Sequence, residues 1–332
     1  MNDAASPPDR VSSTRRRLLK LAMLAPPAAA LSVLPGCSQP EQVDGTFLQP
    51  WLEHLSWTAS DWQRSMKLAR RAGCRQLVLQ WAGILGGEEG DWQLSDTSLA
   101  LLFKAADGAG IDVRVGLPFE HTWWQAIGGD DAQLRAFFSG SLQRARDWLQ
   151  QSRLPLRNRF AGWYLPYELE QYHWTSPARL QWLRDWLHGL QEAAQQRGGD
   201  CAISTYYSRL PGNGKLTTLW AYLLEELELR PMVQDGVGAA GEANLHALEP
   251  LLALFRQRGI GFDVIVELFH QHPDTIGDGS DFKAESADFN RVKRQLQWAR
   301  DSGADNILAY ALEPWLTQGS PEARALRRRW NL

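Results

Sequence analysis

The sequence has 332 residues, 44% of them hydrophobic, and a formal net charge of −3 at pH 7. This length fits two average domains or one α/β barrel of about 250 residues. The weak negative charge argues against a nucleic-acid partner held by phosphate neutralisation, and the composition excludes collagen-like, low-complexity and coiled-coil chains.

The first 36 residues are expected to be an export signal. Residues 14–20 read Thr-Arg-Arg-Arg-Leu-Leu-Lys, which resembles a twin-arginine signal. The apolar stretch that follows, over 21–33, contains Pro26 and Pro27. It is therefore too short and too interrupted to form a stable membrane-spanning helix.

This segment ends in a sequence, Leu34-Pro35-Gly36-Cys37, that is similar to a bacterial lipoprotein cleavage site. The resemblance implies cleavage before Cys37 and lipidation of that cysteine. Ser38 in the next position implies sorting to the outer membrane. Pro35 departs from the small residue usual at its position, and the alternative is an ordinary signal peptide with a chance cysteine.

The mature chain is expected to consist of a polar tether over 37–45 and one folded domain over 46–332. It keeps 30 basic and 36 acidic residues, a formal charge of −6. This balance suits a periplasmic domain that touches a membrane only through its lipid anchor. Cys74 and Cys201 are expected to be buried free thiols, although the compartment would allow a disulfide. No Cys or His spacing is typical of a metal site, so neither a metal nor a cofactor is expected.

One pattern repeats after residue 45: an amphipathic helical stretch ends at glycine, as at Gly110 and Gly259, and an apolar strand follows. Helix starts are marked by a capping box at 60–63 and by Ser176-Pro177. The strand candidates are 47–52, 76–81, 111–117, 160–166, 201–206, 231–235, 262–268 and 306–312.

Eight strands, each followed by a helix, predict a single (β/α)8 TIM barrel. The alternative is a doubly wound sheet. No glycine-rich dinucleotide-binding loop follows the first strand, which argues against that alternative. No second domain is expected, and the protein is expected to be a monomer.

The carboxyl ends of all barrel strands meet at one mouth, where barrel enzymes do their chemistry. Acids, amides and aromatics concentrate at these ends and Lys and Arg are nearly absent, which favours a neutral or weakly charged sugar over a phosphate or another strongly anionic substrate. Most of the 16 tryptophans are expected in the core, with a few facing sugar rings. The candidate substrate-binding residues are Trp51, Gln80, Trp81, Tyr167, Tyr206, Gln234, Asp235, Glu313 and Trp315.

Glu168 closes the fourth predicted strand and Glu267 the seventh. This arrangement resembles the large clan of retaining (β/α)8 glycoside hydrolases. The resemblance implies that Glu168 is the general acid/base and Glu267 the nucleophile, with carboxyls about 5 Å apart. Trp315, after the eighth strand, matches the clan's sugar-stacking tryptophan.

The clan normally has asparagine directly before its acid/base glutamate, where it binds the sugar 2-hydroxyl. Tyr167 holds that place here. Either another donor such as Gln80 or Gln234 replaces the asparagine, or the relation to the clan is loose.

Three blocks, 162–168, 234–238 and 266–269, resemble those of a bacterial barrel family that is catalogued as a domain of unknown function and described as glycosidase-like. The resemblance covers nearly the whole mature chain and implies the barrel fold. It implies glycosidase activity only because that family is described as similar to glycosidases.

Structural roles are the alternatives at each candidate position. Glu168 and Glu267 could bond to aromatic or backbone groups at the barrel rim. Glu170 is expected to be a solvated loop acid, or a replacement for Glu168. Asp235 could cap a turn, bind a substrate hydroxyl or tune the charge of the pair. Tyr206 could orient the nucleophile or simply pack.

The favoured hypothesis is a lipid-anchored retaining glycoside hydrolase that faces the periplasm and acts on a polysaccharide or oligosaccharide. A second hypothesis is a carbohydrate-binding lipoprotein without turnover that assists exopolysaccharide export or assembly. A third is a scaffold lipoprotein whose barrel mouth contacts protein. The sequence does not define the sugar, its linkage, or endo against exo cleavage.

Overall fold

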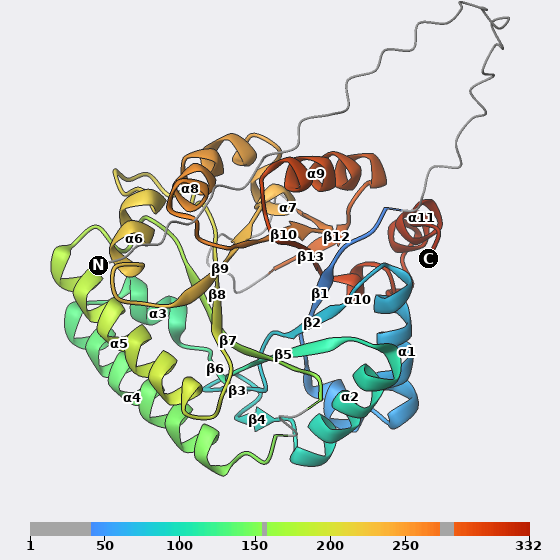
Figure 1. Ribbon diagram of the computed structural model, residues 1–332, viewed down its shortest axis with the longest axis horizontal. Coiled ribbons are helices and arrows are strands. Elements are labelled where there is room, and N and C mark those ends of the chain that lie inside the picture. Colours follow the sequence, from blue (N-terminus) through green and yellow to red (C-terminus); the bar gives the residue numbers. More distant parts are fainter. Residues whose placement is uncertain (1–40, 155–157, 273–281) are drawn as a thin grey trace, which may run out of the picture. The chain divides into compact units, whose positions relative to one another are not determined.

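In the computed structural model, eight parallel strands close into a barrel (Figure 1). The structure describes residues 41–154, 158–272 and 282–332, so the predicted signal, Cys37 and residues 38–40 of the predicted tether lie outside the described residues. The rest of the predicted tether, residues 41–45, is described; Val43 is buried in the core and Gly45 begins β1. Around the barrel the strands follow the order β1 (Gly45–Leu48), β13 (Asn306–Tyr310), β10 (Asp263–Glu267), β9 (Leu229–Gln234), β8 (Cys201–Thr205), β7 (Phe160–Leu169), β5 (Asp112–Gly116) and β2 (Gln76–Leu79).

A helix follows each of these strands and lies outside the barrel (Figure 1). In chain order these helices are α1 (Ala59–Arg71), α2 (Asp96–Ala109), α4 (Asp131–Gln151), α5 (Pro177–Gln195), α6 (Leu216–Leu223), α8 (Asn244–Arg258), α9 (Phe289–Asp301) and α11 (Pro321–Trp330). Shorter helices occupy the loops: η1 (Leu52–Ser56), α3 (Trp123–Gly128), α7 (Val237–Ala240) and α10 (Leu312–Trp315).

Two small sheets also lie in the loops. One joins β3 (Gly83–Leu85), β4 (Trp92–Gln93) and β6 (Phe119–Glu120), and the other joins β11 (Phe269–Gln271) and β12 (Ala284–Ser286). The sequence did not predict them, because strands of two or three residues are too short to show a periodic pattern.

The predicted (β/α)8 barrel and all eight predicted strands are confirmed, with changed ends. Strand β1 ends at Leu48, ahead of Pro50, because proline has no N–H to give to a strand ladder. Strand β7 runs on to Leu169, so Glu168 lies inside the strand. The predicted capping box at 60–63 is wrong by two positions, because Thr58 and Asp61 form it at the start of α1.

Alternate residues of each strand point into the barrel, where an apolar layer fills the middle. This layer consists of Phe47, Val78, Tyr164, Ala202, Met232, Ile265 and Leu308. Because strand side chains alternate with period two, the residues two positions further on form the next layer toward the mouth. That layer contains Gln80, Gln234, Glu267 and Tyr310.

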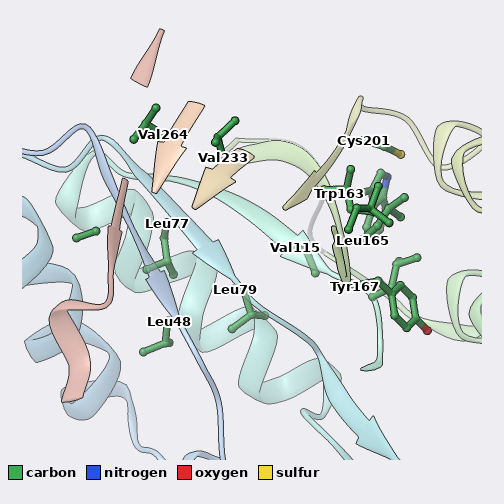
Figure 2. Close-up of a cluster of buried hydrophobic side chains, with 14 of the residues drawn as sticks. Leu48, Leu77, Leu79, Val115, Trp163, Leu165, Tyr167, Cys201, Val233 and Val264 are labelled. Atoms are coloured by element: carbon green, nitrogen blue, oxygen red, sulfur yellow. The ribbon is translucent and has the colours of Figure 1, made fainter. Parts of the chain in front are cut away.

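The outward-facing strand residues pack against the helices and form the larger core. Figure 2 shows Leu77 and Leu79 on β2, Val115 on β5 and Trp163 and Leu165 on β7 among these side chains. Cys201 belongs to the same core, and both Cys74 and Cys201 are buried and free, as the sequence predicted.

A buried ion pair lies at the amino-terminal end of the barrel, opposite the mouth. The Arg230 guanidinium donates to both carboxylate oxygens of Asp263, at 2.8 and 2.5 Å, and Asn306 Nδ2 donates to Asp263 at 2.7 Å. Arg230 also lies 3.0 Å from Asp305. Since Asp263 is fully buried, these donors offset the cost of keeping its charge away from water.

We expect Asp263→Ala to lower the free energy of unfolding by roughly 3 kcal/mol, the low end for breaking a buried pair, because Asp305 remains as a partner for Arg230. Glu249→Ala removes an exposed partner of Arg256 and is the control, with an expected loss below about 1 kcal/mol. Urea unfolding at neutral pH measures both. Equal losses in the two variants would contradict the importance of the buried pair.

Candidate active site

Glu168 lies near the end of β7 and points into the opening of the barrel. Gln234 Nε2, on β9, donates to Glu168 Oε1 at 2.6 Å. Because β8 separates these two strands, both side chains must project inward to meet. Burial raises the pKa of the half-buried Glu168 carboxyl, and the hydrogen bond from Gln234 opposes that rise.

Glu267 ends β10 in the same layer and is only 5% exposed. The backbone N–H of Gly238 donates to Glu267 Oε2 at 2.7 Å. Burial raises the pKa of Glu267, and the negative charges of Asp235 and Glu168 raise it further. The Gly238 hydrogen bond and the Arg291 guanidinium act in the opposite direction.

Tyr310 belongs to the same group of side chains. Its hydroxyl donates to Gln80 Oε1 at 3.1 Å. Burial raises the pKa of the Tyr310 phenol, and the charges of Glu168 and then Glu267 add to the rise. The phenol therefore stays protonated beside both carboxyls and can donate a hydrogen bond at the mouth.

The structure thus brings Glu168, Glu267, Gln234 and Gln80 together, as the sequence predicted, and adds Tyr310. Tyr310 lay inside a predicted strand but was not singled out. Its position along the strand was the available signal. Side chains two residues apart on a strand face the same side, and Tyr310 stands two residues beyond the inward-facing Leu308.

Aromatic side chains lie at the ends of the neighbouring strands. Trp51 is 44% exposed and meets the edge of Trp81 with ring centroids 5.6 Å apart, and Trp81 stacks on Phe119 at 5.4 Å. Trp81 Nε1 donates to the carbonyl of Pro50 at 2.9 Å, which fixes its indole.

A second aromatic contact lies near Glu168. Trp124 is 40% exposed and its ring centroid lies 6.5 Å from that of Tyr206. Burial raises the pKa of Tyr206, and the charge of Glu168 adds to it, which places this phenol near the carboxyl. Of the 16 tryptophans, Trp51 and Trp124 are the two exposed ones among the described residues.

The assignment of Tyr167 to substrate binding is wrong. Its side chain is 3% exposed and packs with Trp123, Phe137 and Trp186 in the helical layer, at centroid distances of 4.8 to 6.1 Å. Figure 2 shows it beyond Leu165 at the end of β7. Since neighbouring strand residues face opposite sides, the inward direction of Glu168 requires Tyr167 to face outward.

Asp235 is also placed differently from its predicted role at the substrate. It is fully buried, and its carboxylate accepts hydrogen bonds from Val237 N–H at 3.1 Å and from Gln295 Nε2 at 2.6 Å. Its alternatives as a turn cap and as a charge beside Glu267 fit the structure. Glu170, expected to be solvated, is buried too and accepts from the backbone N–H and ring Nδ1 of His173.

Glu313 turns away from the carboxyl pair, because it accepts a hydrogen bond from Ser65 on α1 at 2.9 Å. Its predicted role in binding sugar is therefore wrong. Trp315 packs against Phe269 with centroids 5.5 Å apart and is 9% exposed, so little of its ring can meet a ligand.

Two residues on α9 contact the strand end that carries Glu267, and no sequence pattern marks them as site residues. Gln295 Nε2 donates to the Glu267 carbonyl at 3.1 Å, and Arg291 Nη2 donates to the same oxygen at 3.1 Å. They lie on an amphipathic helix as ordinary polar residues, and only the packing of α9 on β10 brings them to the site.

Within the described ranges, no group of three or more His, Cys, Asp or Glu side chains is arranged to hold a metal ion. The helices of these same ranges include none with the length and apolarity needed to cross a membrane.

Residues 43–325 match the family described as "Domain of unknown function (DUF4434)". A curated relative, the uncharacterized protein YbcH of Escherichia coli (strain K12), is 28% identical over 204 residues. The match covers 58% of this chain and 65% of the relative, so the chain spans less than two thirds of the relative's length. The predicted membership of a barrel family of unknown function is confirmed.

Solved structures share the fold. A protein described as a candidate α-L-fucosidase from Bacteroides thetaiotaomicron VPI-5482 has a TM-score of 0.61 and 15% identity, over 88% of this chain and 96% of that chain. A GH113 β-1,4-mannanase has a TM-score of 0.52 and 12% identity, over 88% and 99% of the two chains. At these identities the likeness shows a glycosidase-like barrel fold.

We expect Glu267→Gln to make the protein more stable than the wild type at about pH 8.5, by about 1–3 kcal/mol. A carboxyl whose pKa is raised by folding stabilises the folded state only while it is protonated. That contribution is complete below the usual glutamate value of 4.5 and is lost as the pH rises through the folded-state pKa. A neutral amide avoids this loss, so the two curves should converge near pH 4.5.

Urea unfolding across this pH range measures the difference. Glu88→Gln, at an exposed position, is the control and should leave the curve unchanged. A Glu267→Gln curve parallel to that of the wild type would contradict a raised pKa at Glu267.

Proposed function

The chain belongs to the DUF4434 family, and we propose that it is a retaining glycoside hydrolase acting on a neutral polysaccharide or oligosaccharide of the cell envelope. The observation that carries the proposal is the meeting of Glu168 from β7 with Glu267 from β10 in one polar layer at the barrel mouth. The two carboxyls are near enough that the charge of Glu168 raises the pKa of Glu267, and both charges raise the pKa of Tyr310.

The protonation of the carboxyls at the mouth supports acid–base chemistry. Glu267 lies within the influence of two other carboxyls, those of Asp235 and Glu168, and burial raises the pKa values of all three. The pKa of Glu267 is raised to about 8, so this group of carboxyls keeps a proton near neutral pH. A retaining hydrolase needs this state, one carboxylic acid beside one carboxylate.

The proposed reaction starts from the state in which Glu168 carries the proton and Glu267 is ionised, a state that becomes more populated as the pH rises toward the raised pKa of Glu267. A Glu267 oxygen then attacks the anomeric carbon while Glu168 gives its proton to the glycosidic oxygen. The bond to the leaving group breaks and a glycosyl ester of Glu267 forms. Glu168, now a carboxylate, removes a proton from water, which attacks the same carbon and releases Glu267.

The aromatic side chains support a sugar as substrate. Exposed indoles at Trp51 and Trp124 offer flat apolar faces at two strand ends, with Tyr206 beside the second. Flat aromatic faces match the apolar faces of pyranose rings. Two such positions, one after β1 and one after β5, favour a substrate with several sugar units.

Export by the twin-arginine route and lipidation at Cys37 belong to the same proposal and rest on the sequence of residues 14–37 alone. They would place the barrel in the periplasm, held at the outer membrane by the lipid. The substrate would then be a glycan of that compartment.

A second candidate is carbohydrate binding without turnover, in export or assembly of an exopolysaccharide. The observation that favours it is the outward packing of Tyr167. No β7 side chain directly before Glu168 reaches the mouth, so the asparagine contact typical of the clan has no counterpart there.

We expect Glu168→Gln and Glu267→Gln each to lower kcat for glycan hydrolysis by about 10³-fold or more, because each removes a group that transfers a proton or forms a bond. Glu313→Gln, facing α1, is the matched control and should leave kcat unchanged. Release of reducing ends from a panel of cell-surface and plant-type glycans is the measurement.

The same panel should be read for binding. Azide added to Glu267→Gly should restore turnover and yield a glycosyl azide of inverted configuration, which identifies the nucleophile. Binding of a glycan by wild-type protein with no release of reducing ends would reject the hydrolase and support the second candidate.

We expect Trp51→Ala and Trp124→Ala to raise KM for a polymeric substrate by about 3- to 10-fold each, since a lost stacking contact is worth about 0.5–1.5 kcal/mol. The effect on kcat should be small because neither indole contacts the carboxyl pair. Trp182→Ala is the control, since this indole lies on α5 under Arg135 and away from the mouth. Equal KM values in all three variants would exclude these indoles from the binding surface.

A further inference from the structure

The last residue of β9 and the four residues that follow it include hydrogen-bond donors to both carboxyls of the proposed pair. Gln234 Nε2 donates to Glu168 Oε1 at 2.6 Å, and Gly238 N–H donates to Glu267 Oε2 at 2.7 Å. We propose that the Gln234–Gly238 turn is a positioning element that sets the place and the protonation of both reacting carboxyls at once. This inference rests on the proposed hydrolase function and names the residues that prepare it.

The Asp235 carboxylate stabilises the turn by accepting hydrogen bonds from backbone N–H groups. One of its carboxylate oxygens accepts from Val237 N–H at 3.1 Å and from the Glu267 backbone N–H at 3.4 Å. The turn is thereby tied directly to the strand residue that carries the nucleophile. The fully buried Asp235 carboxylate has no access to substrate, so it acts through Glu267.

Gly236 lets the chain turn at this point. Its φ of +64° lies in the left-handed region, and a Cβ there would lie 2.4 Å from Asn244 Nδ2. That amide donates to the Asp235 carbonyl at 2.9 Å and holds the turn from the side of α8.

Position 238 requires glycine because there is no room for a side chain where its N–H meets the Glu267 carboxyl. A Cβ on this residue would lie 2.8 Å from Glu267 Oε2 and 2.7 Å from the carbonyl oxygen of Phe269. Any side chain would therefore push the carboxyl away from the N–H that binds it. Glycine is the residue that allows a backbone donor to approach this closely.

Helix α9 supports the other side of the arrangement. Gln295 Nε2 donates to Asp235 Oδ2 at 2.6 Å and to the Glu267 carbonyl at 3.1 Å. Arg291 Nη2 donates to the carbonyls of Glu267 and Phe269 at 3.1 and 2.5 Å. The turn and the strand end are thus held together by one helix face.

The charges around Glu267 give the turn a chemical effect as well as a mechanical one. The charged groups that face Glu267 are Asp235 from the end of β9, Glu168 from β7 and Arg291 from α9, and the titratable phenol of Tyr310 comes from β13. Asp235 disfavours the ionised form of Glu267, while the Gly238 N–H favours it. On the other carboxyl, Gln234 favours the ionised form of Glu168.

Two substitutions should therefore move the two carboxyls in opposite directions. Asp235→Asn removes a negative charge and should lower the pH at which Glu267 titrates. Gln295 can turn its amide to meet the new side chain, because its Oε1 has no hydrogen-bond partner in the structure. Gln234→Leu removes the donor to Glu168 and should raise the pH at which Glu168 titrates.

The test is ¹³C NMR of side-chain carboxyls in the full-length protein with labelled Glu, assigned with Glu168→Gln and Glu267→Gln. Opposite shifts of at least half a pH unit support the positioning element. General loosening of the mouth would hydrate both carboxyls and lower both titrations, and this result, or no shift in either, overturns it. The titration is measured without a substrate. It therefore tests the positioning element even if no glycan is cleaved and the hydrolase proposal fails.

Where a glycan substrate has been found, kinetics add a second arm. Gly238→Ala should lower kcat by about 100-fold with little change in KM, since displacement of a reacting group by about 1 Å has an effect of this size. Gly108→Ala, on α2 where a Cβ meets open space, is the matched control and should keep wild-type kcat. A Gly238→Ala enzyme as active as the control overturns the proposal. If this variant does not fold, the NMR shifts decide alone.

Discussion

Alternation of side chains along eight closed strands is the constraint on which the rest of this structure depends. Every second residue must fill the barrel, so each strand contributes to a stack of layers. The amino-terminal layer is ionic, around Arg230 and Asp263, and the middle layer is apolar. The mouth layer is polar and holds Glu168 and Glu267, and the apolar layer beneath it separates its carboxyls from the ionic end.

The same alternation divides the aromatic residues into two populations. Tyr167 and Trp186 belong to a cluster between the barrel and its helices, where burial of large rings stabilises the fold. Trp51 and Trp124 leave the strands on loops and keep much of their surface exposed. The high tryptophan content is therefore mainly a property of the helix–barrel packing, and a small part of it is available at the mouth.

Burial of the acids at the mouth works against folding stability. Glu267 and Asp235 would be hydrated and ionised in the unfolded chain, and the folded protein holds both with their pKa raised. Backbone N–H groups and amide side chains offset part of this cost, which is why Gly238, Gln234 and Gln295 surround the acids. A site used only for structure would be more stable with neutral side chains in these places.

The amino-acid sequence alone determined the barrel and the identity of the carboxyl pair. Glycine-ended helices and apolar strands are local signals, and a strand's last inward residue can be counted from its own periodicity, so Glu168 and Glu267 could be assigned from the pattern. The outward direction of Tyr167 follows from the same counting. Only the tertiary structure decided that Glu313 faces α1, that Asp235 lies behind Glu267, and that Arg291 and Gln295 reach the site. Those contacts join residues from 24 to 248 positions apart along the chain, and they depend on how helices settle on the barrel, which no local periodicity encodes.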